Sequence, residues 1–422
     1  MEFNQIFAIA VFVVAMALIM SEKVHRTVVS LVGAMLLIIT GIMSFDTAVT
    51  HIDFNTLGIL FGMMLFVSVA KQSGLFQYLA VRTAKLAKGD PWKIMIMFAI
   101  LTAILSAFLD NVTTVLLIGP MTLTICEILD IDPVPYFLIE IMSSNAGGTA
   151  TLIGDPPNIM IGSAAGYSFT DFLIYDGPAA VFVMAATIAS FYFIFGRKLE
   201  VSDERKARVM ELEPAFEDDR LMKQSVVMLV VVVVCFMVHD RLGLQSSVVA
   251  ITASAILLGI SHRNVTEALQ GVEWTTLAFF AGLFIIVGGL QETGIITMLA
   301  TLFVTITGGN TFLTMLVILI ASAIISSVLD NIPFVATMIP ILLAMQAEGM
   351  DITPLWWALS LGACLGGNGT LIGASANVVL SDISARHGHP ITFMQYLKIG
   401  YPIMLMSIAI SAVYLVIRFP PM

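Results

Sequence analysis

An internal repeat constrains this chain more than any other feature of its sequence. With a shift of 220 residues, SAFLDN at 106–111 matches SSVLDN at 326–331, and with a shift of 219, GGTATLIG at 147–154 matches GGNGTLIG at 366–373. Self-similarity over such a distance indicates a fold built from two copies of one unit. We therefore expect two domains, 1–196 and 225–422, joined by a polar linker at 197–224.

The composition decides where the two copies reside. Hydrophobic residues make up 59% of the chain, charged residues only 11%, and the mean hydropathy is +0.99. Soluble domains carry about 25% charged residues, and the apolar runs here are long enough to cross a hydrocarbon layer of roughly 30 Å. A soluble enzyme is excluded, and the pattern predicts an all-α polytopic membrane protein.

Each copy shows the same order of segments. Three apolar helices precede a helical hairpin with a polar tip, then a long apolar segment interrupted by glycine and proline, and a final helix. The hairpins are predicted at 92–109 with 115–129 and at 312–329 with 336–345, and the interrupted segments at 134–165 and 354–381. If the hairpins are re-entrant, each repeat has five transmembrane helices, one of them broken.

Five crossings per repeat would place the second copy upside down relative to the first. The positive-inside rule supports this, because with the N-terminus outside 17 of the 19 Lys and Arg residues fall on the cytoplasmic side. We expect two inverted repeats with both termini outside, in the inner (plasma) membrane of a bacterium or archaeon.

Four acids lie deep in apolar sequence: Asp110, Glu140, Asp155 and Asp330. Ionisable residues inside a membrane are costly and usually functional. No Lys or Arg falls within a predicted span, so we expect a proton or a bound cation to neutralise these acids. Glu140 is a possible proton carrier, although a simple hydrogen bond to a neighbouring helix is an equal alternative.

The hairpin tips carry the strongest pair of candidate residues. Asp110 with Asn111 and Asp330 with Asn331 occupy equivalent positions of the repeat, and Thr113 and Thr114 follow the first pair. Carboxylate, amide and hydroxyl oxygens suit a small hard cation, so Na⁺ is predicted at the two Asp-Asn pairs. The alternative is that each Asp only caps the following helix.

The two interruptions supply neutral groups for the same site. Non-helical backbone at membrane depth is tolerated where it lines a cavity inside the protein, although small residues there could also serve close helix packing. The candidate ion or substrate ligands of these segments are Asn145, Gly148, Thr149, Thr151, Asp155, Asn158, Gly367, Asn368, Thr370, Ser375 and Asn377.

Four motifs carry a family resemblance that extends over nearly the whole chain. LDNVTT, GGTATLIGDPPN, LDNIPFVATMIP and ACLGGNGTLIGASANVV resemble the ArsB/NhaD permeases of the ion transporter superfamily, with the greatest likeness to the P protein branch. The resemblance implies a homodimer in which a transport domain slides as an elevator past a scaffold. The Ser-Asn-Thr sodium motifs of that superfamily are replaced here by Asp-Asn at both tips.

These observations favour a secondary active ion transporter, most simply a Na⁺/H⁺ antiporter. Two alternatives stay open: an arsenite, oxyanion or small-carboxylate permease coupled to H⁺ or Na⁺, and a passive anion (chloride) channel. No nucleophile-base pair, phosphate loop or metal cluster suggests an enzyme, and nothing indicates nucleic-acid binding. The expected partners are the lipid bilayer, a small ion or anion and a second copy, with Na⁺ or H⁺ in place of a cofactor.

Overall fold

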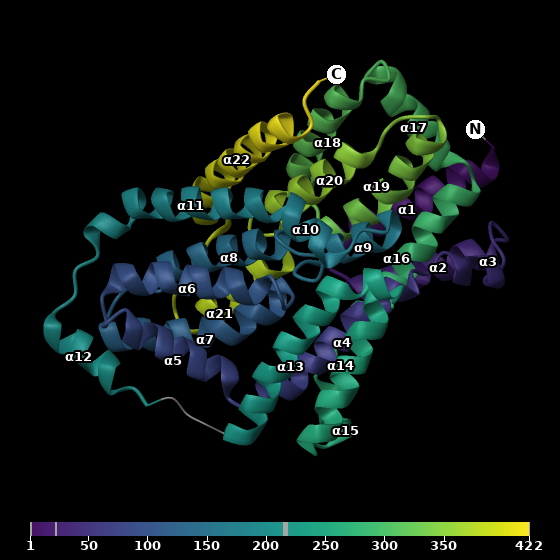
Figure 1. Cartoon of the computed structure of the whole chain (residues 1–422). Helices are drawn as coiled ribbons and strands as arrows, with labels where there is room; N and C mark the ends of the chain where they lie inside the picture. Colours follow the sequence, from purple (N-terminus) through teal and green to yellow (C-terminus); the bar gives the residue numbers. More distant parts are fainter. Residues whose placement is uncertain (1, 22, 214–217, 422) are drawn as a thin grey trace.

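The computed structural model describes residues 2–21, 23–213 and 218–421 (Figure 1). These residues form twenty-two α-helices and two short 3₁₀ helices, and no strand occurs among them. The all-α prediction is confirmed.

A similar series of helices occurs twice along the chain, with one extra short helix, α10, in the first half. The first half contains α1 (Phe3–Ser21), α2 (Arg26–Ile39), α3 (Phe45–Thr50), α4 (Phe54–Lys71), α5 (Leu75–Leu86), α6 (Pro91–Ser106), α7 (Asn111–Leu129), α8 (Val134–Thr149), α9 (Pro156–Ala165), α10 (Phe169–Tyr175) and α11 (Gly177–Ile194). The second half contains α13 (Asp219–Val238), α14 (Ser246–Ser261), α15 (Val265–Gln270), α16 (Trp274–Glu292), α17 (Ile295–Ile306), α18 (Thr311–Ser326), α19 (Asn331–Ala347), α20 (Thr353–Gly366), α21 (Ser375–Arg386) and α22 (Phe393–Arg418). Between the halves lie the 3₁₀ helix η1 (Gly196–Lys198) and α12 (Asp203–Glu211), and η2 (Asp240–Leu242) follows α13.

The two halves exchange partners when they pack. Helix α2 packs on α16 and its counterpart α14 packs on α4, while α7 packs on α21 and its counterpart α19 packs on α9. Within each half, α6 packs on α8 and α18 on α20. Every pairing keeps its equivalent when the halves are interchanged, as in two copies related by an approximate twofold axis. Inversion of the copies across a membrane stays a prediction.

Seven helices are long and apolar enough to cross a membrane, or eight if the pair α17 and α18, bent by 116°, counts as one span. The seven are α1, α4, α7, α11, α13, α16 and α22. Helices α2, α6, α14 and α19 are shorter but also apolar. The chain is an integral multi-pass membrane protein, and the ten-crossing topology, which also uses α2, α14 and the broken segments as spans, stays a prediction.

The structure adds helices where the sequence was interpreted as loops. The segments after α4 and α16 contain α5 and α17, each beginning after a glycine with positive φ, Gly74 at 76° and Gly294 at 75°. Helix α5 buries Phe76 and Ala80 on one face, so it is amphipathic rather than spanning. The solvated linker also forms α12, where Arg205 binds Asp130 at 2.7 Å. Residues 214–217 of the predicted linker lie outside the described residues.

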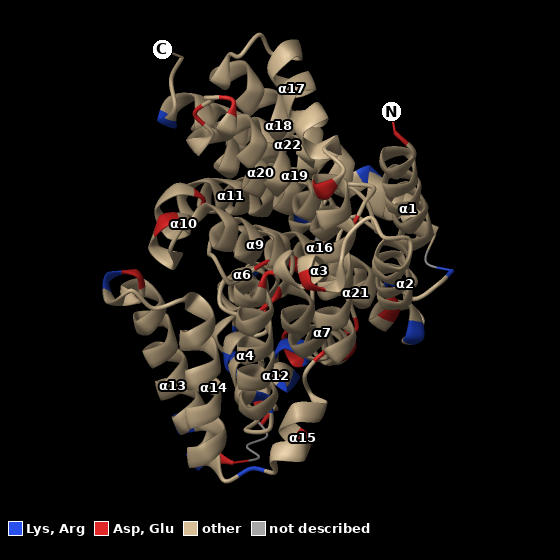
Figure 2. Ribbon diagram, turned by 90° about the vertical axis from the view of Figure 1, so that its right-hand side faces the viewer, with Lys and Arg blue, Asp and Glu red and all other residues tan. Residues whose placement is uncertain are grey.

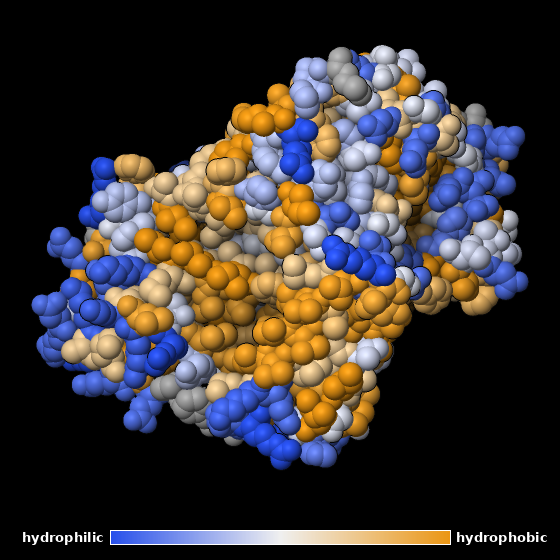
Figure 3. Space-filling model, in the orientation of Figure 1, coloured by the Kyte–Doolittle hydropathy of each residue, from blue (hydrophilic) through white to orange (hydrophobic). Residues whose placement is uncertain are grey.

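The surface is that of a protein surrounded by lipid. Hydrophobic residues spread over the middle of the face in Figure 3, and hydrophilic residues gather at its left end around α12. Exposed apolar side chains on α13 include Val227, Val230 and Val234. In Figure 2, Lys, Arg, Asp and Glu lie mainly at helix ends and connections.

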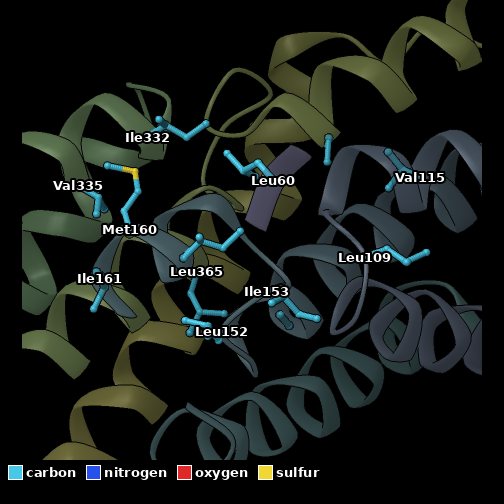
Figure 4. Packing of buried hydrophobic residues seen from close by; sticks show 14 of the residues in the cluster. Leu60, Leu109, Val115, Leu152, Ile153, Met160, Ile161, Ile332, Val335 and Leu365 are labelled. Atoms are coloured by element: carbon cyan, nitrogen blue, oxygen red, sulfur yellow. The ribbon is translucent and has the colours of Figure 1, made fainter. Parts of the chain in front are cut away.

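Apolar packing encloses the places where the helices break. Leu109 and Val115 flank the tip between α6 and α7, and Ile332 and Val335 follow the tip between α18 and α19 (Figure 4). Leu152 lies in the break between α8 and α9 and is 1% exposed. These apolar side chains beside both tips and in this break are therefore buried, and burial of each contributes roughly 1.5–3 kcal/mol.

Candidate functional site

Each hairpin tip is closed by its aspartate. Asp110 accepts hydrogen bonds from the Thr113 backbone N–H at 2.9 Å and from Thr113 Oγ1 at 2.5 Å, which makes it the N-cap of α7. Asp330 accepts from the Ile332 backbone N–H at 3.3 Å and caps α19. The capping alternative therefore describes both residues, and cation binding at these positions stays a prediction.

An arginine neutralises one of the two tips, contrary to the sequence analysis. Arg26 Nη1 lies 3.2 Å from Asp330 Oδ2 and 3.2 Å from Ser375 Oγ. The expectation that no permanent cation reaches the buried acids was wrong for Asp330, because Arg26 is not in a loop but begins α2. The guanidinium points from that helix end to a tip 304 positions away in sequence.

Arg26 is held from behind by α16. Its guanidinium carbon lies 5.2 Å from the centre of the Phe279 ring, and Nη2 lies 3.5 Å from Thr276 Oγ1. Thr276 Oγ1 in turn donates to Glu273 Oε2 at 2.9 Å. A cavity of about 350 Å³ opens at this ion pair, and His25, Arg26, Asp330 and Ser375 are its polar lining residues.

Two equivalent asparagines close the breaks in the helices. Asn158 Nδ2 donates to the carbonyls of Thr149 at 3.1 Å and Thr151 at 3.0 Å, with Gly148 O at 3.4 Å. Asn377 Nδ2 donates to Gly367 O at 2.7 Å and Thr370 O at 2.9 Å. Their amide groups thus satisfy carbonyls that the breaks release, as buried carbonyls require.

The threonines of the breaks fasten them to the hairpins. Thr151 Oγ1 donates to Ala107 O, and Thr370 Oγ1 donates to Ser327 O at 2.5 Å. The two donors are equivalent in the repeat, and so are the two acceptors. These hydrogen bonds tie each break to the end of the first helix of its hairpin.

The glycines of the breaks serve close backbone approach. A Cβ on Gly148 would lie 2.7 Å from Gly154 O, and a Cβ on Gly367 would lie 3.1 Å from Ala374 Cβ. Close packing of small residues, the alternative raised from the sequence, therefore accounts for both positions.

Asn145 is the centre of a buried amide cluster. Its Nδ2 donates to Asn368 Oδ1 at 2.8 Å and Asn377 Oδ1 at 3.1 Å, and its Oδ1 accepts from Asn111 Nδ2 at 3.3 Å. All four side chains are at most 5% exposed. The cluster joins the first hairpin tip and α8 to the second broken segment, and ion or substrate binding by these residues stays a prediction.

A second cluster surrounds Asp155. Asn331 Nδ2 lies 3.3 Å from both carboxylate oxygens of Asp155, which is 1% exposed. Asp155 is within electrostatic range of Asp330 and Asp110, and Asp110 is within range of Glu273. Asp110, Asp155, Asp330 and Glu273 are therefore electrostatic neighbours, each of at least one other. Of these acids, Asp330 makes an ion pair with Arg26.

The remaining predicted residues have separate places. Thr122 Oγ1 on α7 donates to Glu140 Oε1, while Glu140 Oε2 and Thr114 Oγ1 have no hydrogen-bond partner within the described residues. Thr149 Oγ1 donates to Asn145 O at 2.7 Å. The hydrogen bond proposed as the alternative for Glu140 is present, and its role as a proton carrier stays a prediction.

Sequence reasoning missed several residues of this region. Arg26 was counted among the basic residues of the connections and Glu273 was not singled out, although Arg26 begins the apolar helix α2 and Glu273 directly precedes the apolar helix α16. Asp176 was missed because the sequence Asp-Gly-Pro is typical of an ordinary helix start, yet its side chain is fully buried. Cys364, which lies in apolar sequence and was not singled out, has its Sγ 3.4 Å from Asn158 Oδ1.

The described residues contain no group of three or more His, Cys, Asp or Glu side chains that could hold a metal ion. The polar atoms that converge here are amide and carbonyl oxygens, single carboxylates and one guanidinium. Such a set offers ligands for a small cation on one side and for an anionic group at Arg26 on the other.

Comparison with solved structures supports the fold. The YdaH transporter of Alcanivorax borkumensis superimposes with a TM-score of 0.65 over 94% of this chain and 99% of its own, at 15% sequence identity. At that identity the likeness concerns the fold alone.

Comparison with other sequences gives the family. An uncharacterized transporter of Mycobacterium tuberculosis is 43% identical over 98% of both chains, and a 46 kDa membrane protein of Mycobacterium leprae is 42% identical over 98% of this chain and 99% of its own. The P protein of Mus musculus is 33% identical over 97% of this chain, which spans 60% of that longer protein. A family model described as citrate transporter (CitMHS) matches residues 16–362. Membership of the superfamily is thus confirmed, the narrower ArsB/NhaD assignment stays a prediction, and the chain belongs to the CitMHS citrate transporter family.

Proposed function

We propose that this protein is a secondary active transporter that carries a small anion, most simply a carboxylate, together with Na⁺ or H⁺. The observation that carries the proposal is the Arg26–Asp330 ion pair at 3.2 Å in the wall of a cavity of about 350 Å³. A guanidinium that already binds a carboxylate can bind the carboxylate of a substrate in its place. The hydroxyl of Ser375 and the N-terminus of α21 supply further donors beside it.

The surrounding acids make a coupling cation necessary in this scheme. Asp110, Asp155 and Glu273 lie within electrostatic range of one another or of Asp330, the partner of Arg26, so a substrate anion would be repelled unless positive charge entered with it. Protons can neutralise these carboxyl groups, or Na⁺ can bind at the tips through Asp110, Asn111, Asp330 and Asn331. The cation in this scheme lowers the electrostatic cost of loading the anion.

Alternating access would follow an elevator movement of the hairpins and broken helices against α2, α4, α14 and α16. The exchanged pairing of the two halves supports inverted repeats, since each half supplies the same surfaces to the other. Both termini lie toward the top of Figures 1 and 2, whereas α12 of the linker lies lower in both views, as expected when both termini are outside. A homodimer, expected from the family resemblance, would keep the scaffold still.

Na⁺/H⁺ antiport is the second candidate. The excess of acids over bases around Arg26 favours it, because carboxyl groups that exchange Na⁺ for H⁺ need no anionic substrate. Arsenite or another oxyanion would use the Arg26 cavity in the manner of a carboxylate. A passive chloride channel would use the same positive group but would not be driven by a cation gradient.

Reconstitution into liposomes tests these candidates. Labelled citrate is offered outside, with an inward Na⁺ gradient, an inward proton gradient or neither. Gradient-driven uptake that is lost in Arg26→Gln and kept in Arg241→Gln, a matched change at an exposed arginine, supports the proposal. A pH-sensitive dye in the same vesicles reports sodium-driven proton movement, and such movement without uptake of citrate, succinate or arsenite would replace the proposal by antiport.

A further inference from the structure

Asp176 is a fully buried acid that the transport scheme above does not use. It lies between α10 and α11 and is 0% exposed. Its Oδ2 lies 2.5 Å from Ser360 Oγ, and its Oδ1 has no hydrogen-bond partner within the described residues. An ionised carboxylate in that setting would face a large desolvation cost with one hydrogen bond to offset it.

Ser360 lies between two oxygen atoms. Its Oγ is 2.5 Å from Asp176 Oδ2 and 2.7 Å from Asn158 Oδ1. A hydroxyl group carries a single proton and can donate only one full hydrogen bond. One of the two short contacts therefore needs a proton from the other partner.

Asn158 cannot supply that proton. Its Nδ2 lies against the carbonyl oxygens of Gly148, Thr149 and Thr151, which only accept hydrogen bonds. The amide is thus fixed with Oδ1 toward Ser360, and Oδ1 is an acceptor. The proton must come from Asp176, so that Asp176 Oδ2 donates to Ser360 Oγ and Ser360 Oγ donates to Asn158 Oδ1.

We propose that Asp176 binds a proton in this conformation and that this proton fixes the break between α8 and α9 through Ser360 and Asn158. If Asp176 loses the proton to water, the Ser360 hydroxyl turns to the new carboxylate. Asn158 Oδ1 then faces a lone pair of the serine oxygen at 2.7 Å and keeps only the weak thiol donor of Cys364 at 3.4 Å. The clamp across the break weakens next to Asp155, which precedes α9. The further step, that this proton is coupled to transport, rests on the function proposed above and makes H⁺ a coupling ion.

The titratable groups near Asp176 do not take over its role as the group that binds the proton. Cys364 of α20 and Tyr414 of α22 are the titratable side chains within electrostatic range. Arg418, at the end of α22, lies over the ring of Tyr175, 4.6 Å from its centre. Helices α8 and α10 carry Glu140, which is bonded to Thr122, and Asp171, which is bonded to Ser168.

Infrared spectroscopy of the purified protein tests the proton directly. A protonated carboxyl group gives a C=O stretching band that shifts on deuteration, and at neutral pH the wild-type protein should show a band that Asp176→Asn removes. Asp351→Asn is the matched control, since Asp351 is exposed and accepts a hydrogen bond from the Thr353 backbone N–H at 3.0 Å just before α20. Ser360→Ala should keep the band but shift it, because the acceptor of its hydrogen bond is lost.

Transport measurements test the coupling. Asp176→Asn can still donate a hydrogen bond to Ser360, so it should fold like the wild type. Its rate of labelled citrate uptake should change at least tenfold less between low and high pH than the rate of the wild type. The Asp351→Asn control should keep the wild-type profile. A wild-type protein that transports no anion would contradict the proposed function. The infrared spectra need no substrate, so they would still show whether Asp176 is protonated.

Two results would overturn the inference. The first is an unchanged carboxyl band in Asp176→Asn, which shows that Asp176 is ionised in the wild type. The second is proton-driven uptake in Asp176→Asn with the wild-type pH profile. If Asp176→Asn does not fold, an unshifted band in Ser360→Ala also overturns the inference, because Ser360 then does not accept from a carboxylic acid.

Discussion

Asn145 donates a hydrogen bond of 2.8 Å to Asn368, from α8 of the first half to the break after α20 of the second. A second bond from the same amide nitrogen, 3.1 Å long, reaches Asn377 on α21. Both amide protons of Asn145 are used, and its oxygen accepts from Asn111. The two broken segments and one hairpin tip therefore depend on one side chain for their relative positions.

Asn145→Ala should destabilise the protein and reduce transport. The change leaves an amide of Asn111 and the side-chain oxygens of Asn368 and Asn377 without their partner, and each unsatisfied buried group costs about 1–3 kcal/mol. Thermal unfolding in mild detergent should show a clearly lowered midpoint. Cys364→Ala is the control, because Cys364 is equivalent to Asn145 in the repeat but its thiol, 3.4 Å from Asn158 Oδ1, is only a weak hydrogen-bond donor. Equal losses in both variants would contradict the central role of Asn145.

The repeat explains why much of this site could be predicted. The tips and the breaks differ from the apolar sequence around them in both halves, so the equivalent pair Asn111 and Asn331 could be assigned to one region without any structure. Asn145 and Asp155 have Cys364 and Ala374 in the equivalent places, so they were assigned only because they lie in or beside the first break. The equivalent pairs Thr151 with Thr370 and Asn158 with Asn377 also perform equivalent tasks. The hydrogen bonds that these side chains make were less predictable, because the backbone conformation of each break determines which carbonyl oxygens need a donor.

The residues that sequence reasoning misplaced are those whose partners lie far away in the chain. Arg26 looked like a loop residue because charge counts assign helix ends to the aqueous side, whereas packing of α2 on α16 brings it to Asp330. The short helix α5 was overlooked because its basic residues are typical of a loop, and α17 was overlooked with it although its sequence is apolar. Tertiary packing decides such elements, and local propensity does not.

Arg26 and Asp330 should affect substrate affinity in opposite directions. In the anion scheme the Asp330 carboxylate competes with substrate for the guanidinium, so Arg26→Gln should raise the KM for the transported anion at least tenfold, about 1.4 kcal/mol. Asp330→Asn removes the competitor and should lower KM while slowing release, so that kcat falls. Initial rates of labelled citrate uptake over a range of concentrations measure both effects. A rise of KM in both variants would argue that the pair is only structural.

Asp218, which precedes α13, should make the stability of the protein depend on pH in the acid range. The backbone N–H of Leu221 and the guanidinium of Arg263, 2.7 Å away, lower the pKa of Asp218 below its ordinary value of 3.8. Because the folded state holds the lower pKa, the stabilisation is present above pH 3.8 and is lost as the pH falls through the folded value.

Asp218→Asn keeps a good N-cap residue but cannot ionise. Its melting midpoint should lie below that of the wild type at neutral pH, and the difference should shrink as the pH falls below 3.8. Arg263→Gln should give the same pattern in a weaker form, since it leaves the backbone hydrogen bond to Leu221 in place. A difference that stays constant across the acid range would show that the ionised carboxylate of Asp218 adds no stability.

Gly147 and Gly366 should both resist substitution, because each lets a broken helix touch the first helix of its hairpin. A Cβ on Gly147 would lie 2.1 Å from Ala103 O, and one on Gly366 would lie 2.7 Å from Ala323 Cα. Backbone atoms cannot yield as a side chain can, so each change to alanine should cost about 1–3 kcal/mol or more. Gly147→Ala should be the worse of the two, since its contact is shorter.

Gly259→Ala provides the matched control within a helix of the same protein. A Cβ there meets nothing within 4 Å, and Gly259 lies inside α14. Alanine should therefore leave the melting midpoint unchanged or raise the stability by up to about 1 kcal/mol, the difference in helix propensity. If Gly147→Ala and Gly366→Ala melt like Gly259→Ala, the contacts of α6 with α8 and of α18 with α20 are looser than described, and the breaks would not be carried rigidly with their hairpins.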